Sequence, residues 1–129
     1  MNDEIEELCD LGADLADAGG FSKALEAYES AWSLLEHPAH EREGSAWILG
    51  NIGYTRFLQG DYAAARDDLT RAMTLPGGDR NAFLHLRLGQ CLHELGDHPR
   101  AAEQFRLALA LEGEAVFIDE APRYRALID

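Results

Sequence analysis

Apolar and small residues recur along this chain with the spacing of amphipathic helices, and the pattern itself repeats three times. In each copy a large aliphatic residue precedes a glycine, and a second glycine follows seven residues later. Because residues three, four and seven apart share one face of a helix, each copy predicts two helices joined by a glycine turn. We expect helices over residues 3–18, 21–36, 42–59, 62–75, 80–95 and 98–112, and a further helical segment near 114–121.

The three copies coincide at six positions of one register. Alanine stands twelve and nineteen residues after the first glycine, and an aromatic residue or leucine stands sixteen residues after it. The coinciding residues are Leu11, Ile52 and Leu88; Gly12, Gly53 and Gly89; Gly19, Gly60 and Gly96; Ala24, Ala65 and Ala101; Tyr28, Leu69 and Phe105; and Ala31, Ala72 and Ala108. This agreement indicates a repeat protein.

Each position of the register has a physical interpretation. The first glycine faces the alanine twelve residues on, so that the two helices of one copy approach closely. The residue sixteen positions on fills the groove between one copy and the next. The second glycine ends the first helix in a left-handed conformation, and Asp61 and Asp97 follow at once to cap the second helix.

This pattern resembles the tetratricopeptide repeat, a helix–turn–helix unit of about 34 residues. The resemblance spans about residues 8–112, although the copies are offset by 41 and 36 residues. It implies an all-α fold, an α-solenoid of three helix–turn–helix repeats plus a C-terminal capping segment. We expect a single domain, 1–129, with repeats at about 5–38, 46–79 and 82–115 and a cap at about 114–129, similar to small stand-alone bacterial proteins of this family.

The residues after the third repeat are apolar enough to cover its open face, as the last unit of a repeat array requires. An alternative is that this tail docks into a second copy of the chain. The residues expected to form the cap are Val116, Phe117, Ile118, Tyr124, Leu127 and Ile128.

The formal net charge of −13 is unevenly distributed, because residues 1–36 hold ten acidic side chains and a single basic one, Lys23. Such a balance disfavours nucleic acid as a partner and is typical of a solvated face. We find neither an apolar run of the ~20 residues that span a membrane nor an export signal, and therefore expect a cytoplasmic protein. Cys9 and Cys91 lie too far apart to suggest a disulfide framework or a zinc site.

In this family the first helices of successive repeats line a concave surface, which the resemblance implies as a peptide-binding groove. Helical spacing selects the stripe that the glycine register leaves free, and Cys9, Ala13, Gly50, Leu58 and Glu94 share it. Its aromatic residues fit either the core or an exposed peptide seat. The candidate groove residues are Glu6, Asp10, Asp17, Trp47, Asn51, Tyr54, Phe83, Leu86, Arg87 and Gln90.

Some members of the family hold the C-terminal carboxylate of heat-shock chaperones with a clamp of lysine, asparagine, asparagine, lysine and arginine. Asn51 and Arg87 match two of these places, but Cys9, Ala13 and Phe83 stand at the other three. The cationic first half of the clamp is missing, so we do not expect recognition of such a tail.

We expect no enzyme and no cofactor, because the sequence holds neither a phosphate-binding glycine loop nor a nucleophile motif. The histidines at 85, 93 and 98 lie near each other in the sequence, as do those at 37 and 40. The pair at 37 and 40 is interpreted as solvated junction residues rather than metal ligands. The leading hypothesis is an adaptor or chaperone whose partner offers apolar anchors and basic residues. The alternatives are a secretion-chaperone-like or toxin-neutralising partner protein, and a structural homo-oligomer.

Overall fold

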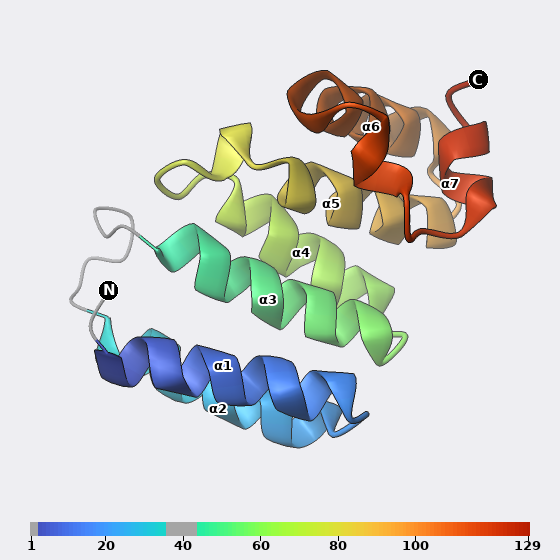
Figure 1. Ribbon diagram of the computed structural model, residues 1–129. Coiled ribbons are helices and arrows are strands. Elements are labelled where there is room, and N and C mark those ends of the chain that lie inside the picture. Colours follow the sequence, from blue (N-terminus) through green and yellow to red (C-terminus); the bar gives the residue numbers. More distant parts are fainter. Residues whose placement is uncertain (1–2, 36–43) are drawn as a thin grey trace.

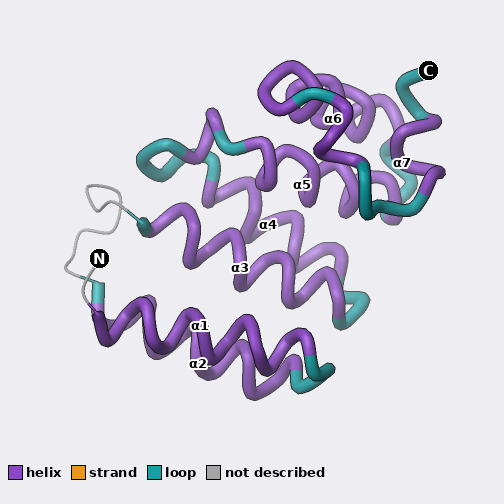
Figure 2. Tube along the Cα trace, viewed as in Figure 1, coloured by secondary structure: helices purple, strands orange, loops and turns teal. Residues whose placement is uncertain are grey.

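The computed structural model describes residues 3–35 and 44–129, and within these ranges the chain is helical and contains no strand (Figure 1, Figure 2). The parts of the expected helices that fall in residues 36–43 lie outside the described residues. The helices are α1 (Asp3–Asp17), α2 (Phe21–Leu34), α3 (Ser45–Leu58), α4 (Tyr62–Ala72), α5 (Ala82–Glu94), α6 (His98–Glu112) and α7 (Pro122–Ala126), with short 3-10 helices η2 (Gly78–Arg80) and η3 (Glu114–Phe117).

The six long helices form three antiparallel hairpins that stack in chain order (Figure 1). Helix α1 packs on α2, α3 on α4 and α5 on α6, while α2 packs on α3 and α4 packs on α5 between the hairpins. Helix α3 also contacts α5 directly, so the first helices of neighbouring hairpins approach one another. This is the predicted α-solenoid. Along the described part of the chain, no helix is both long and apolar enough to cross a membrane.

The turns inside the hairpins follow the sequence prediction. Gly19, Gly60 and Gly96 have φ angles of +82°, +84° and +86°, a conformation that residues with a Cβ atom rarely adopt. In the second and third hairpins an aspartate then caps the next helix. Asp61 accepts a hydrogen bond from the amide of Ala64, and Asp97 accepts one from the amide of Arg100, both at 3.3 Å.

Two predicted boundaries are wrong in the connection between α4 and α5. Helix α4 ends at Ala72 rather than at residue 75. The chain then tightens into turns in which the amides of Thr74 and Leu75 donate to the carbonyl oxygens of Arg71 and Ala72, and Pro76 disfavours the helical conformation for Leu75. After η2, Asn81 caps α5 by accepting a hydrogen bond from the amide of Leu84 at 3.3 Å. Helix α5 therefore begins at Ala82, two residues later than expected.

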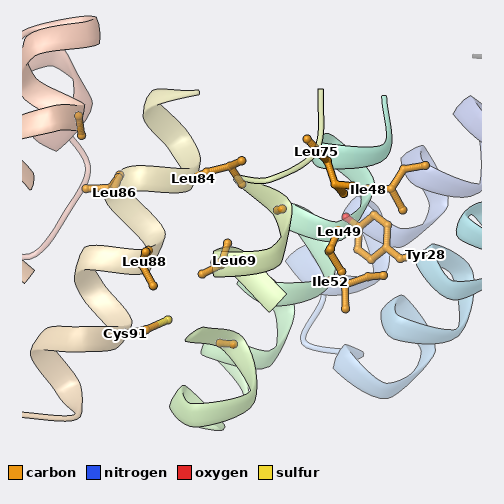
Figure 3. Packing of buried hydrophobic residues seen from close by; sticks show 14 of the residues in the cluster. Tyr28, Ile48, Leu49, Ile52, Leu69, Leu75, Leu84, Leu86, Leu88 and Cys91 are labelled. Atoms are coloured by element: carbon orange, nitrogen blue, oxygen red, sulfur yellow. The ribbon is translucent and has the colours of Figure 1, made fainter. Parts of the chain in front are cut away.

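The glycines of the repeat pack against a different partner from the one expected. A Cβ atom at Gly89 would lie 2.6 Å from Cε1 of Phe105, and a Cβ atom at Gly12 would lie 2.7 Å from Cε1 of Tyr28. The first glycine therefore faces the residue sixteen positions on, not the alanine twelve positions on. This contact lies within one hairpin, and the core formed in this way runs continuously from hairpin to hairpin (Figure 3).

The C-terminal segment covers the last hairpin, but not as the single helix 114–121 that the sequence suggested. It forms η3 and then α7, which begins at Pro122, where a missing amide hydrogen costs nothing. Phe117 and Tyr124 are buried, and their rings lie 5.7 and 5.8 Å from the ring of Phe105. Ile118 is 79% exposed, so its expected place in the cap is wrong.

Candidate functional site

We call the side of the solenoid formed by the first helices of the three hairpins, α1, α3 and α5, the inner face. It carries an aromatic cluster contributed by α3 and α5. The ring of Tyr54 meets that of Phe83 edge-on at 5.6 Å and stacks on that of Phe57 at 6.2 Å. The guanidinium of Arg87 lies 4.0 Å from the centre of Tyr54 and 5.1 Å from that of Phe83. These contacts join the three rings and the guanidinium into one contiguous cluster.

Arg87 is bound by the protein's own C-terminal segment. Its Nη1 donates to Oε1 of Glu120 at 2.6 Å and to Oε1 of Gln90 at 2.9 Å. Nε2 of Gln90 donates to the same oxygen of Glu120 at 2.6 Å. The side chains of Arg87 and Glu120 are only 12% and 16% exposed, so little water screens this pair. We call Arg87, Gln90 and Glu120 the Arg87 cluster.

Glu120 is the residue at this site that the sequence reasoning missed. It lies 33 positions beyond Arg87, in a segment interpreted only as an apolar cap. A signal was available, because an arginine predicted to lie among aromatic rings needs a carboxylate partner when it is buried. The short acidic stretch Asp119-Glu120 in the cap was the candidate for that partner.

The first hairpin gives the inner face its negative charge. Glu6, Asp10 and Asp17 are exposed on α1, and none of them forms an ion pair with a lysine or arginine in residues 3–35 or 44–129. Burial, together with the charges of Asp10 and Glu6, raises the pKa of the Cys9 thiol to about 11. Among the described residues, these carboxylates have no lysine or arginine partner, so the potential at this end is negative.

The structure places the predicted residues at different depths. Trp47 is 41% exposed, and its carbonyl oxygen accepts a hydrogen bond from Nδ2 of Asn51 at 2.9 Å. Leu86 and Gln90 are only 3% and 1% exposed, because α4, α6 and the C-terminal segment surround α5. Cys9 is also buried, although it was expected on the same stripe. Leu86 and Gln90 therefore support the surface from beneath.

A second group of hydrogen-bonded side chains, Glu94, Arg123 and Tyr124, joins the C-terminal end of α5 to α7. Oε1 of Glu94 accepts hydrogen bonds from the Tyr124 hydroxyl at 2.7 Å and from Nη2 of Arg123 at 2.9 Å. The Tyr124 hydrogen bond, assisted by Arg123, holds the pKa of the Glu94 carboxyl below its ordinary value. The pKa of His93 is also lowered, in this case by burial. Its ring packs 5.2 Å from that of Tyr124.

The histidines do not form a metal site in the described part of the chain. His85 is buried, with Nδ1 2.7 Å from Oε1 of Gln104 and Nε2 2.8 Å from the carbonyl oxygen of Asp79. It ties the loop before α5 to α6, which is a structural role. No group of three or more metal-ligating side chains occurs among the residues described, and the histidines at 37 and 40 lie outside them.

Stacked helical hairpins whose first helices line one inner face define an α-solenoid repeat protein. The chain belongs to the tetratricopeptide repeat family, because the family model described as "Tetratricopeptide repeat" matches residues 45–111, just over half of its length.

One curated relative shares this repeat region. Mouse tetratricopeptide repeat protein 36 is 45% identical over 67 residues, which are 52% of this chain and 32% of the relative. The matched part therefore spans about a third of that protein.

Solved structures with the same fold cover nearly the whole chain. The first TPR domain of Spaghetti (RPAP3), bound to the HSP90 peptide SRMEEVD, has a TM-score of 0.76 and 16% identity over 97% of this chain and 89% of that one. The Yersinia enterocolitica type III secretion chaperone SycD, in complex with a peptide of the translocator YopD, has a TM-score of 0.77 and 16% identity over 99% and 92%. At this identity the two structures show the fold.

Proposed function

We propose that this chain is a non-catalytic adaptor or chaperone that holds a segment of another protein against its inner face. The observation that carries the proposal is the partly exposed aromatic surface of Trp47, Tyr54 and Phe83. It lies beside an acidic stripe on α1 that forms no ion pair with a lysine or arginine of residues 3–35 or 44–129. Aromatic anchors with a charged rim are typical of peptide seats. In support, the two structural neighbours described above each hold a peptide.

The surface chemistry specifies the kind of segment that fits. Aromatic or aliphatic side chains of the partner would pack on Trp47, Tyr54 and Phe83, and basic side chains would lie toward Glu6, Asp10 and Asp17. A seat of this kind binds at about micromolar strength, roughly −8 kcal/mol. We assign it to one domain, residues 1–129, with repeats at about 5–38, 46–79 and 82–115.

The Arg87 cluster argues against a strongly acidic segment. Arg87 is the cation on the inner face of α5, and Glu120 already neutralises it. An acidic peptide would have to displace Glu120 and then face the carboxylates of α1. The proposed seat therefore differs from one that grips a chaperone tail ending in acidic residues.

The test is an affinity capture with matched variants, read by quantitative mass spectrometry. Trp47→Ala removes an aromatic anchor, and the double change Asp10→Lys with Asp17→Lys reverses the acidic stripe. Leu107→Ser is the control, because Leu107 is exposed on α6 to 47%, close to the 41% of Trp47. A partner should be enriched on wild-type protein and the control and lost from both inner-face variants. A partner retained by the inner-face variants and lost from Leu107→Ser would overturn the proposal.

A further inference from the structure

The residue before the first glycine of each repeat differs sharply in exposure between the hairpins. Ile52 and Leu88 occupy this position in the second and third hairpins, and each is only 5% exposed. Leu11 occupies it in the first hairpin and is 49% exposed. Leu11 is therefore an exposed apolar residue at a position that is buried in each of the other two copies.

Leu11 belongs to an apolar hollow on the outer end of the first hairpin. The hollow has a volume of about 350 Å³ and lies over α1 and α2. No element of residues 3–35 or 44–129 other than these two helices lines it. We call it the N-terminal face; it is lined by Leu8, Leu11, Leu15, Lys23, Glu26, Ala27 and Ser30.

In the second and third hairpins, the surface that corresponds to this hollow is covered by a helix of the preceding hairpin. In the second hairpin α2 packs on α3, and Figure 3 shows Leu49 and Ile52 lying beside Tyr28 of α2. In the third hairpin α4 covers α5 in the same way. Leu8 and Leu11 hold the positions that correspond to Leu49 and Ile52, four residues and one residue before the glycine. The N-terminal face is therefore shaped for a helix.

The charged residues around the hollow indicate which kind of helix could bind there. Glu4, Glu7, Asp14 and Glu26 are all exposed on α1 and α2, and Lys23 is the single cation of these two helices. A second copy of the chain would bring the same carboxylates to the contact, which is repulsive. We propose that the N-terminal face binds an amphipathic helix of another protein, with a leucine-like stripe flanked by lysine or arginine. This surface is separate from the inner face, so the proposal does not depend on the seat described above.

The experiment uses two synthetic helical probes with the same leucine stripe, one flanked by lysines and the other by glutamates. Binding to the whole chain is measured by titration calorimetry, and backbone amide shifts in NMR spectra locate it. The lysine probe should shift the amides of Leu8, Leu11 and Ala27, and Leu11→Ser should weaken it about tenfold or more. Leu107→Ser, at a leucine of nearly equal exposure (47%), should leave binding unchanged. The glutamate probe should not bind.

Three outcomes would overturn the proposal. The first is lysine-probe binding that Leu11→Ser leaves unchanged while the amides of Trp47 and Tyr54 shift, which would place the basic helix on the inner face. The second is equal binding of the two probes, which would remove the role of charge. The third is a dimer of the free chain that light scattering detects and Leu11→Glu dissociates, which would assign this face to a second copy. The separate capture experiment with Trp47→Ala tests only the proposed peptide seat on the inner face, and its result does not bear on the N-terminal face.

Discussion

At the residue scale, the glycine inside each first helix is explained by the ring or leucine that lies against it. Glycine in the middle of a helix costs about 0.5–1 kcal/mol relative to alanine, so its recurrence requires a compensating contact. At Gly89 that contact is Phe105, which is fully buried and is held by Phe117 and Tyr124. Because protein interiors are closely packed, the Phe105 ring cannot move aside without disturbing these neighbours.

Gly89→Ala should therefore destabilise the protein in spite of the better helix propensity of alanine. A Cβ atom 2.6 Å from the Phe105 ring forces the core apart, which costs about 1–3 kcal/mol of the free energy of unfolding. Urea denaturation followed by circular dichroism measures the change, with Ser33→Ala on the exposed face of α2 as the control. A Gly89→Ala protein as stable as wild type would show that the close contact is not a constraint.

At the element scale, the ion pairs that attach the C-terminal segment should differ in how much they stabilise the fold. Glu120 contributes a nearly buried pair with Arg87, whereas Glu114 pairs with Arg125 at 2.8 Å while remaining 67% exposed. Removing one partner of a buried pair leaves the other charge without compensation, but solvent screens an exposed pair. The two carboxylates, six residues apart in one segment, allow this difference to be measured.

Glu120→Ala should lower the free energy of unfolding by about 1–3 kcal/mol, because Arg87 loses its charged partner and Nε2 of Gln90 loses its acceptor. Glu114→Ala should have a much smaller effect. Chemical denaturation of both variants provides the comparison. Equal losses, or a larger loss for Glu114→Ala, would contradict the account of the Arg87 cluster.

The attachment of α7 should weaken in acid. The pKa of Glu94 is lower in the folded protein than its ordinary value of 4.5, so the folded state binds its proton less readily than the unfolded state. The stabilisation is complete above pH 4.5 and is lost as the pH falls through the lower folded pKa. His93, whose pKa is also lowered, adds a loss of the same sign as the pH falls below 6.5.

Glu94→Gln should therefore flatten the fall of stability between pH 5 and pH 3. The measurement is the urea midpoint across this range for wild type and Glu94→Gln, with the exposed Glu112→Gln as the control. An unchanged acid slope in Glu94→Gln would show that this carboxylate is not a source of the pH dependence.

At the scale of the whole molecule, local signals in the sequence were enough to predict the hairpins. Gly19, Gly60 and Gly96 end the first helices because a left-handed residue is needed there, and this requirement is readable from spacing alone. The partner of Gly89 was not readable, since alanine and phenylalanine both lie on the facing side of the second helix. The choice between them depends on how the two helices are rotated about their axes, which packing decides.

The inner face was harder to predict than the hairpins, for a related reason. Helical spacing correctly separates the exposed Trp47 from the buried Leu49, but it treats α3 and α5 alike. In the structure η3 also contacts α5, so Leu86 and Gln90 are covered. The contact between Arg87 and Glu120 joins residues 33 positions apart through an irregular segment, and no periodicity encodes it. The composition of the peptide seat stays a prediction.

The measurement that tests the central claim most directly is titration calorimetry of the captured partner segment with wild type, Trp47→Ala and Leu107→Ser. If the segment lies on the inner face, Trp47→Ala should weaken binding by about 1–3 kcal/mol, roughly five-fold to more than a hundred-fold, at an unchanged melting temperature. Leu107→Ser should bind like wild type. Wild-type affinity in Trp47→Ala, together with loss of binding in Leu107→Ser, would place the site on the exposed side of α6 and contradict the account.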